Sequence, residues 1–248
     1  MKSLYWAVYK SKMKRFTIAL SLLLLSSTGF TQTARDYFKI GRQHIEAKAW
    51  QEAADAFGKA IEIKPDWAVA YTLRGRAYQA MGNWKEALEN LDNALKYDDS
   101  HFRPWQVRAQ VRDKMGDKEG AVANYTQMLE RNPAHQSSRL KRLHLLYGLK
   151  RYQEALDDCE ILIKAQPENV RLYQVEAMLF ESLDRPKDAV SSYTKAIDLD
   201  GTNPKYYFNR GQIKLVLQDE KGSCKDFKKS VALGGEKAKD WLTFCEKD

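Results

Sequence analysis

The sequence lacks a long apolar run and contains little proline, cysteine and histidine. Its most apolar stretch, residues 16–25, is about half as long as the roughly 20 residues that a membrane-spanning helix needs, so a multi-pass membrane protein is excluded. Six prolines and 13 glycines in 248 residues exclude a collagen-like chain as well. The content of 44% hydrophobic and 30% charged residues is typical of a soluble folded chain without long disordered tails.

The residue patterns that carry common chemistries are also missing. No glycine-rich phosphate loop, paired metal-ligand spacing or nucleophile elbow occurs in the sequence. His101 and His135 lie 34 residues apart, which indicates a repeated turn rather than a metal site. Acidic pairs such as Asp98 with Asp99 are typical of helix ends and turns. We therefore expect a non-catalytic protein with no catalytic residue, no metal site and no cofactor.

The net charge of +8 is concentrated at the start of the chain. Residues 1–33 hold five of the 41 cations and no acid, so the rest of the chain carries 36 cations against 33 acids, a net charge of +3. A chain this close to neutrality lacks the broad positive field that drives phosphate binding. We expect no nucleic-acid partner.

Residues 1–33 have the order of a secretory signal peptide, with a basic, an apolar and a small polar region in succession. Met13 begins a more conventional leader than Met1, so residues 1–12 are a candidate mis-assigned start, and the sequence does not fix the cleavage bond near Gln32. The leader predicts export, in a style typical of bacteria, to the periplasm, the cell envelope or the exterior. No stable membrane span is expected after signal cleavage. The alternative is an uncleaved signal anchor.

One pattern recurs every 34 residues from residue 34 onward. Each unit has helical apolar periodicity on both sides of a turn, which predicts a helical hairpin. One hairpin cannot bury its apolar face alone, so successive hairpins are expected to stack into a solenoid. The repeated positions are small at Ala53, Ala87, Ala121, Ala155, Ala189 and Ser223, bulky four residues later at Phe57, Leu91, Tyr125, Cys159, Tyr193 and Phe227, and aromatic near the start of the unit at Tyr37, Tyr71, Trp105, Tyr173, Tyr207 and Trp241, with Arg139 as the exception.

This pattern resembles the tetratricopeptide repeat (TPR) family, and the stretch from Tyr71 to Leu91 is a close match to its repeat. The resemblance covers the whole chain after the leader and implies an all-α, right-handed superhelical solenoid of helix-turn-helix repeats. Six units are predicted, at residues 34–67, 68–101, 102–135, 136–169, 170–203 and 204–237. Residues 238–248 are predicted to form a capping helix, with Trp241 and Phe244 covering the last unit. Because repeats and cap take up all residues after the leader, an enzyme is disfavoured.

The repeat frame also places the three cysteines. Cys224 falls on the second helix of the sixth unit, and Cys245 lies at the small-residue position of the capping helix that packs against it. We predict a Cys224–Cys245 disulfide in an oxidising compartment, with two free buried thiols as the alternative. Cys159 holds a core position and is expected to be a small apolar residue rather than a nucleophile.

Arginines recur immediately before the small residue of the first helix. They are expected to pair with polar groups on the second helix, which would be a structural role, although ligand binding is the alternative. Glu176 interrupts the series. The cations are Arg74, Arg108, Arg142 and Arg210, and the expected partners are Asn90, Asn124, Asp158 and Asp226.

In the TPR family the first helices line a concave groove that commonly holds an extended peptide or a partner helix. The resemblance therefore implies a groove in which arginine and amide side chains dominate. Arginine offers paired donors to carboxylates, so we expect a protein or peptide partner that is acidic or presents its carboxyl terminus. The alternatives are a merely solvated inner face, or an accessory module that binds peptidoglycan or another envelope polymer. The groove residues are Arg42, Arg76, Arg103, Gln106, Gln110, Lys141, His144, Arg171, Gln174, Lys205, Phe208, Asn209 and Gln212.

Overall fold

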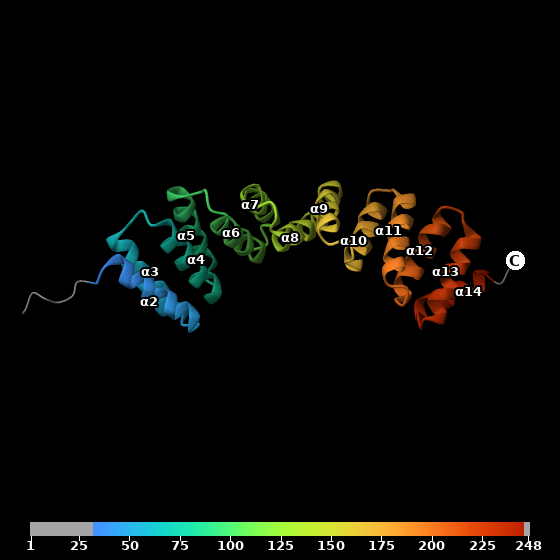
Figure 1. The fold of residues 1–248 in the computed structure, drawn as a ribbon, viewed down its shortest axis with the longest axis horizontal. Helices are drawn as coiled ribbons and strands as arrows, with labels where there is room; N and C mark the ends of the chain where they lie inside the picture. The colour runs from blue at the N-terminus through green and yellow to red at the C-terminus, as the bar shows by residue number, and fades with distance from the viewer. Residues whose placement is uncertain (1–31, 246–248) are drawn as a thin grey trace, which may run out of the picture.

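The computed structural model describes residues 32–245, and this part of the chain is helical throughout, with no strand. Two helices occupy each predicted unit (Figure 1). The pairs are α2 Ala34–Glu46 with α3 Trp50–Ile63, α4 Ala68–Met81 with α5 Trp84–Tyr97, α6 Phe102–Lys114 with α7 Lys118–Arg131, α8 Gln136–Gly148 with α9 Tyr152–Ala165, α10 Val170–Ser182 with α11 Pro186–Leu199, and α12 Pro204–Val216 with α13 Glu220–Ala232.

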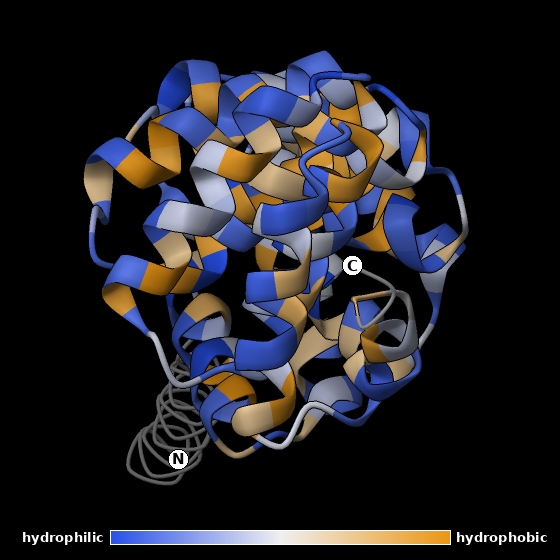
Figure 2. Ribbon diagram, turned by 90° about the vertical axis from the view of Figure 1, so that its right-hand side faces the viewer, coloured by the Kyte–Doolittle hydropathy of each residue, from blue (hydrophilic) through white to orange (hydrophobic). Residues whose placement is uncertain are grey.

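The hairpins follow one another in chain order along one long axis, from α2 at one end to α14 (Lys239–Cys245) at the other (Figure 1). Viewed down that axis, the helices form a ring (Figure 2). The predicted all-α solenoid is confirmed. The predicted leader lies outside the described residues up to residue 31, as does the end of the predicted cap at residues 246–248. Within residues 32–245, no helix combines the length and apolarity needed to cross a membrane.

The turn within each hairpin uses the same backbone conformation. A residue with a positive φ follows the first helix at positions 48, 82, 116, 150, 184 and 218, with φ between 55° and 84°. Only two of these residues, Gly82 and Gly116, are glycines, for which this conformation carries no steric cost. At the other four positions, a residue with a side chain adopts this backbone conformation, as Lys150 and Gln218 do. The packing of the two helices therefore fixes the turn even where the residue is unfavourable.

The core lies between the helices of each hairpin, where the repeated small and bulky residues meet. All six small residues are fully buried, and all six bulky residues are at most 1% exposed. The approach is close enough to require glycine in places: a Cβ added to Gly41 would lie 2.7 Å from the ring of Phe57, and one added to Gly211 would lie 2.8 Å from the ring of Phe227. The 34-residue pattern thus marks the contacts that hold each hairpin together.

In three units the leading aromatic has a second role, because its polar tip donates a hydrogen bond to the carbonyl oxygen six residues earlier. Trp105 Nε1 donates to Asp99 O at 3.1 Å, and the hydroxyls of Tyr173 and Tyr207 donate to the carbonyls of Pro167 and Gly201 at 2.9 and 3.2 Å. Arg139, the exception in the sequence pattern, makes the same contact by donating from Nη2 to Pro133 O at 2.8 Å. The guanidinium therefore replaces both the bulk and the donor of the aromatic.

The predicted pairing of Arg74, Arg108, Arg142 and Arg210 with polar residues on the second helix is confirmed, and we call this set of contacts the arginine ladder. Each cation donates to the polar residue 16 positions later, on the second helix of its own hairpin. Arg142 and Arg210 hold both oxygens of Asp158 and Asp226, at 2.7–2.9 Å. Three of the four arginines also donate to the second helix of the preceding hairpin. The acceptors there, 16 residues before each arginine, are Asp92 for Arg108, Thr126 for Arg142 and Thr194 for Arg210. The ladder therefore joins neighbouring hairpins as well as the helices within each one.

In the fifth hairpin, Glu176 occupies the position at which the second, third, fourth and sixth hairpins have an arginine. Its carboxylate accepts a hydrogen bond from Ser192 Oγ at 2.7 Å. Burial raises the pKa of Glu176; the hydrogen bond from Ser192 offsets part of this effect, and the carboxylates of Glu160 and Asp188 raise the pKa further. In the series from Arg74 to Arg210, this is the one ladder position that holds a carboxylate instead of an arginine.

We predict that the burial of the Glu176 carboxylate, together with the repulsion from Glu160 and Asp188, makes stability depend on pH. Because the folded chain binds the Glu176 proton more tightly than the unfolded chain, the free energy of unfolding falls as pH rises from below the ordinary value of 4.5 through the raised value. Glu176→Gln should therefore become more stable relative to the wild type between about pH 4 and pH 7, measured by urea unfolding. Glu168→Gln, at an exposed position, is the control. A stability difference that stays constant with pH would contradict the prediction.

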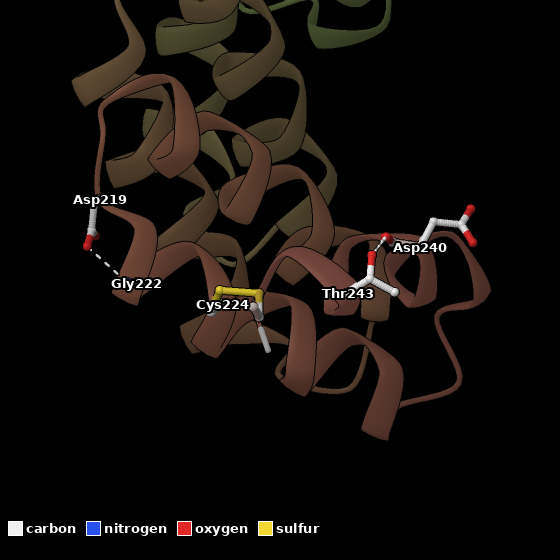
Figure 3. The surroundings of a disulfide bond; sticks show 6 residues. Asp219, Gly222, Cys224, Asp240 and Thr243 are labelled. Carbon is white, nitrogen blue, oxygen red and sulfur yellow. Dashed lines mark hydrogen bonds between the residues drawn. A yellow bond between two sulfur atoms is a disulfide. The ribbon is translucent and has the colours of Figure 1, made fainter. Parts of the chain in front are cut away.

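The last helix closes the solenoid. The ring of Trp241 lies against that of Phe227 in α13, with centroids 5.3 Å apart. Cys224 of α13 and Cys245 of α14 are joined by a disulfide, with their Cα atoms 5.5 Å apart (Figure 3). The side chain of Phe244, predicted to share the capping role with Trp241, lies outside the described residues.

Candidate functional site

A hollow of about 550 Å³ opens between the first helices of the first three hairpins. Helices α2, α4 and α6 line it, together with the segment that leads into α6. Its apolar residues are Phe38, Ile45, Ala68, Val69, Leu73, Phe102 and Pro104, and its polar or charged residues are Arg42, Glu46, Thr72, Arg76, Asp98, His101 and Arg103.

Aromatic packing holds the apolar side of this hollow in place. The ring of Phe38 stacks on Trp67, with centroids 4.4 Å apart, and meets the edge of the buried Phe57 at 5.6 Å. Val69 remains 41% exposed on α4, although it faces a region rich in apolar atoms. Exposed apolar surface in a concave, aromatic-supported site is typical of a place where a ligand buries its own apolar group.

Three arginines line the hollow and outnumber its two carboxylates, Glu46 and Asp98. Arg42, Arg76 and Arg103 come from successive hairpins, and none of them forms an ion pair with another residue in the range 32–245. Asp98 is already occupied, because its Oδ1 accepts hydrogen bonds from the backbone N–H and the hydroxyl of Ser100, and these bonds lower the pKa of Asp98. The three guanidinium groups are therefore free to bind carboxylates.

The hydroxyl group in the hollow is engaged in a structural hydrogen bond. Thr72, its hydroxyl-bearing residue, is buried and donates to Ala68 O at 2.9 Å. Burial raises the pKa values of one thiol and three phenol groups, those of Cys159, Tyr71, Tyr125 and Tyr193, and none of these four residues lines the hollow. In the described part of the chain, no group of three or more potential metal ligands occurs.

The structure gathers three of the predicted groove residues, Arg42, Arg76 and Arg103, around this hollow. Three others are bound to neighbouring residues. Gln106 donates to Ser138 Oγ at 3.3 Å, Gln110 accepts from Gln79 at 3.1 Å, and Asn209 donates to the hydroxyl of Tyr193 at 3.0 Å. Phe208 packs against Phe227, with ring centroids 6.0 Å apart. Of the remaining predicted residues, Lys141, His144, Arg171 and Lys205 are exposed, while Gln174 and Gln212 are half-buried.

Sequence reasoning missed the apolar half of the site. Phe38 lies four residues before Arg42 on α2, and Ile45 lies three residues after it, so both share its helix face. Val69 and Phe102 occupy the start of the next two first helices. A helical-face analysis of the arginine positions could have found Phe38 and Ile45. The contributions of Val69 and Phe102 depend on how three hairpins curve around one another.

Family comparisons agree with this architecture. Tetratricopeptide repeat models match residues 44–111, 107–170 and 170–203. The chain is 24% identical over 208 residues to the DnaJ protein P58IPK homolog A of Oryza sativa subsp. japonica, covering 75% of this chain and 43% of that protein. It is 24% identical over 219 residues to the BBSome complex member BBS4 of Bos taurus, covering 75% and 42%. The chain thus spans less than half the length of these relatives.

Solved structures show the same fold at low sequence identity. The TPR protein YrrB, described as having an unusual peptide-binding site, is 17% identical with a TM-score of 0.61, over 74% of this chain and 95% of that chain. MamA is 18% identical with a TM-score of 0.60, over 70% and 94%. Together, the family matches, the paired helices and the 34-residue pattern of buried contacts establish that the chain belongs to the tetratricopeptide repeat family.

Proposed function

We propose that this protein is an exported, non-catalytic scaffold that binds a segment of a partner protein in the hollow formed by α2, α4 and α6. The observation that carries the proposal is the position of Arg42, Arg76 and Arg103, which are unpaired within the described residues and surround exposed apolar surface. Members of the TPR family generally act as non-catalytic scaffolds, and the structurally similar YrrB has a peptide-binding site, which supports a peptide ligand here.

The chemistry of the hollow defines the expected ligand. A large apolar side chain would pack among Phe38, Val69 and Phe102, where it displaces water from aromatic surface. Carboxylates on either side of that anchor would accept the paired N–H groups of the arginines, which hold them more specifically than lysines would. The preferred ligand is therefore an acidic segment with one apolar anchor.

Labelled synthetic peptides test this preference directly. The panel shares one central phenylalanine, flanked by glutamates in one set and by lysines in the other. Fluorescence anisotropy should detect binding of the glutamate-flanked set alone. Equal binding of both sets, or binding of the lysine set only, would contradict the expected ligand chemistry.

Charge reversal at Arg76 and Arg103 tests the location. Arg76→Glu with Arg103→Glu should weaken binding of the acidic peptides at least about tenfold, a loss of about 1.4 kcal/mol. The double change Lys85→Glu with Lys118→Glu is the matched control, since it alters the same net charge at exposed positions of α5 and α7. Undiminished binding by the arginine variant would exclude this hollow.

Cross-linking in the native cell, followed by mass spectrometry, would identify the partner. The mature mass of the purified chain tests export, because signal cleavage would remove most of residues 1–33. Envelope extracts treated with a glycanase separate the two ligand classes. A partner that is retained after treatment supports the protein ligand, whereas one that is lost supports an envelope polymer such as peptidoglycan.

A further inference from the structure

The capping helix α14 is short and packs against α13 and the turn that precedes it. It has seven residues, far fewer than the roughly 12 to 15 that a helix needs to persist alone in water. Its described contacts include the packing of Trp241 on Phe227, the disulfide from Cys224 to Cys245, and an ion pair between Lys239 Nζ and Glu236 Oε2 at 2.7 Å. A helix this short depends on its tertiary contacts, and the disulfide is the covalent one among them.

The chain just before α14 is fixed independently of that bond. Gly235 N donates to Ser230 O at 2.9 Å, and the hydroxyl of Ser230 donates to Pro204 O at 2.9 Å. Ala238 is fully buried. If the disulfide opened, these contacts would hold the chain as far as residue 238, so release would be confined to residues 239–245.

The disulfide is also accessible from solvent. Cys224 and Cys245 are only half-buried, and a hollow of about 600 Å³ beside them is lined by Glu220, Lys221, Lys225 and Lys228. The bond spans the gap between α13 and α14 near the start of α13, whose first turn is capped by Asp219 accepting from Gly222 N at 2.9 Å (Figure 3). Three lysines beside a disulfide favour the arrival of an attacking thiolate and stabilise the thiolate that leaves.

Cys159 provides an internal contrast. It is fully buried and its thiol lies 3.4 Å from Leu172 O. Burial, together with the carboxylates of Glu176, Glu160 and Asp158, raises the pKa of Cys159 to about 12. It is therefore a thiol that exchange reagents do not reach in the folded chain.

We propose that the Cys224–Cys245 disulfide is a reversible thiol–disulfide exchange site whose reduction by a dithiol releases α14. A thiolate of the dithiol attacks one sulfur of the bond, which forms a mixed disulfide and expels the other cysteine as a thiolate. The second thiol of the reductant then attacks the mixed disulfide and releases the first cysteine. Two electrons and two protons pass from the dithiol to the cystine, leaving two cysteine thiols and an oxidised, disulfide-bonded reductant.

Thiol counting under native conditions tests the exchange. Before reduction, the folded chain should have no reactive thiol. After treatment with dithiothreitol or a thioredoxin-type dithiol protein and removal of the reductant, it should have two, and mass spectrometry should place them at Cys224 and Cys245. Cys159 should react only after denaturation. If Cys224 and Cys245 stay oxidised in the folded chain, the proposal is overturned.

Hydrogen exchange tests the release. Reduction should raise amide exchange in residues 239–245 by roughly a hundredfold, as expected for losing a cross-link across a loop of this length. Exchange in α10 and α11 should not change. The double variant Cys224→Ser with Cys245→Ser should show the fast exchange without reductant and no further response to it. Two new thiols with unchanged exchange in residues 239–245 would overturn the release.

The lysines are tested by the rate of reduction. Replacing Lys221, Lys225 and Lys228 together by glutamine should slow reduction by dithiothreitol several-fold. Replacing the exposed Lys164, Lys187 and Lys195 by glutamine removes the same charge elsewhere and should leave the rate unchanged. Equal rates in the two triple variants would overturn the role assigned to the lysines.

Discussion

Replacing Asp158 by alanine is expected to lower the free energy of unfolding by about 3 to 5 kcal/mol, because it leaves two largely buried guanidinium groups without their anion. The side chain of Asp158 is 1% exposed and accepts from Arg139 at 2.9 Å and from Arg142 at 2.7 and 2.8 Å. Arg139 is itself 9% exposed, so water cannot replace the lost partner easily. Urea unfolding followed by circular dichroism measures the change.

Two further variants separate the ion pair from helix propensity and side-chain size. Asp157→Ala, next along α9, removes an exposed carboxylate and should change stability by less than about 0.5 kcal/mol. Asp158→Asn should fall between the two, since asparagine serves a single arginine in the second and third hairpins but here would face two. Similar losses of stability for Asp157→Ala and Asp158→Ala would contradict a stabilising buried ion pair at Asp158.

The contacts that recur every 34 residues could be read from the sequence because each makes the same packing demand in every hairpin. Ala121 with Tyr125, and Arg142 with Asp158, are examples. Departures from the repeat were harder to interpret. Arg139 interrupts the aromatic series, but its bond to Pro133 O depends on a side-chain path that periodicity does not describe. Lys150 adopts a positive φ that its residue type disfavours, because the packing of α8 on α9 overrides local preference.

The candidate site was less predictable than the fold. The family groove positions identified Arg42, Arg76 and Arg103, which meet at one hollow. The same positions also identified Gln106 and Asn209, whose amides bond to Ser138 and Tyr193 in neighbouring hairpins. Which groove residues remain free depends on distances between hairpins, and those follow from the curvature of the stack. A pattern within one repeat carries no information about that curvature.

Tyr193 connects two neighbouring hairpins through its buried side chain. Its ring is 1% exposed in α11, and its hydroxyl donates to Glu181 at 3.2 Å and accepts from Asn209 at 3.0 Å. Tyr193→Ala should cost about 3 to 5 kcal/mol through the cavity it leaves. Tyr193→Phe should cost about 1 to 3 kcal/mol, because the ring remains while two polar partners lose their bond. Leu199→Ala, at a 36% exposed position of α11, is the control for side-chain truncation.

The helices that Tyr193→Ala destabilises are as informative as the size of the free-energy loss. In a solenoid each hairpin contacts only its neighbours, so opening at Tyr193 should spread to the adjacent hairpins and fade with distance. Hydrogen exchange in Tyr193→Ala should therefore rise most in α10, α11 and α12 and least in α2 and α3, at the far end of the stack (Figure 1). An equal rise in all six hairpins would indicate one cooperative unit. Because the arginine hollow lies in the first three hairpins, the predicted gradient also implies that Tyr193→Ala weakens the end of the molecule far from the ligand while peptide binding persists.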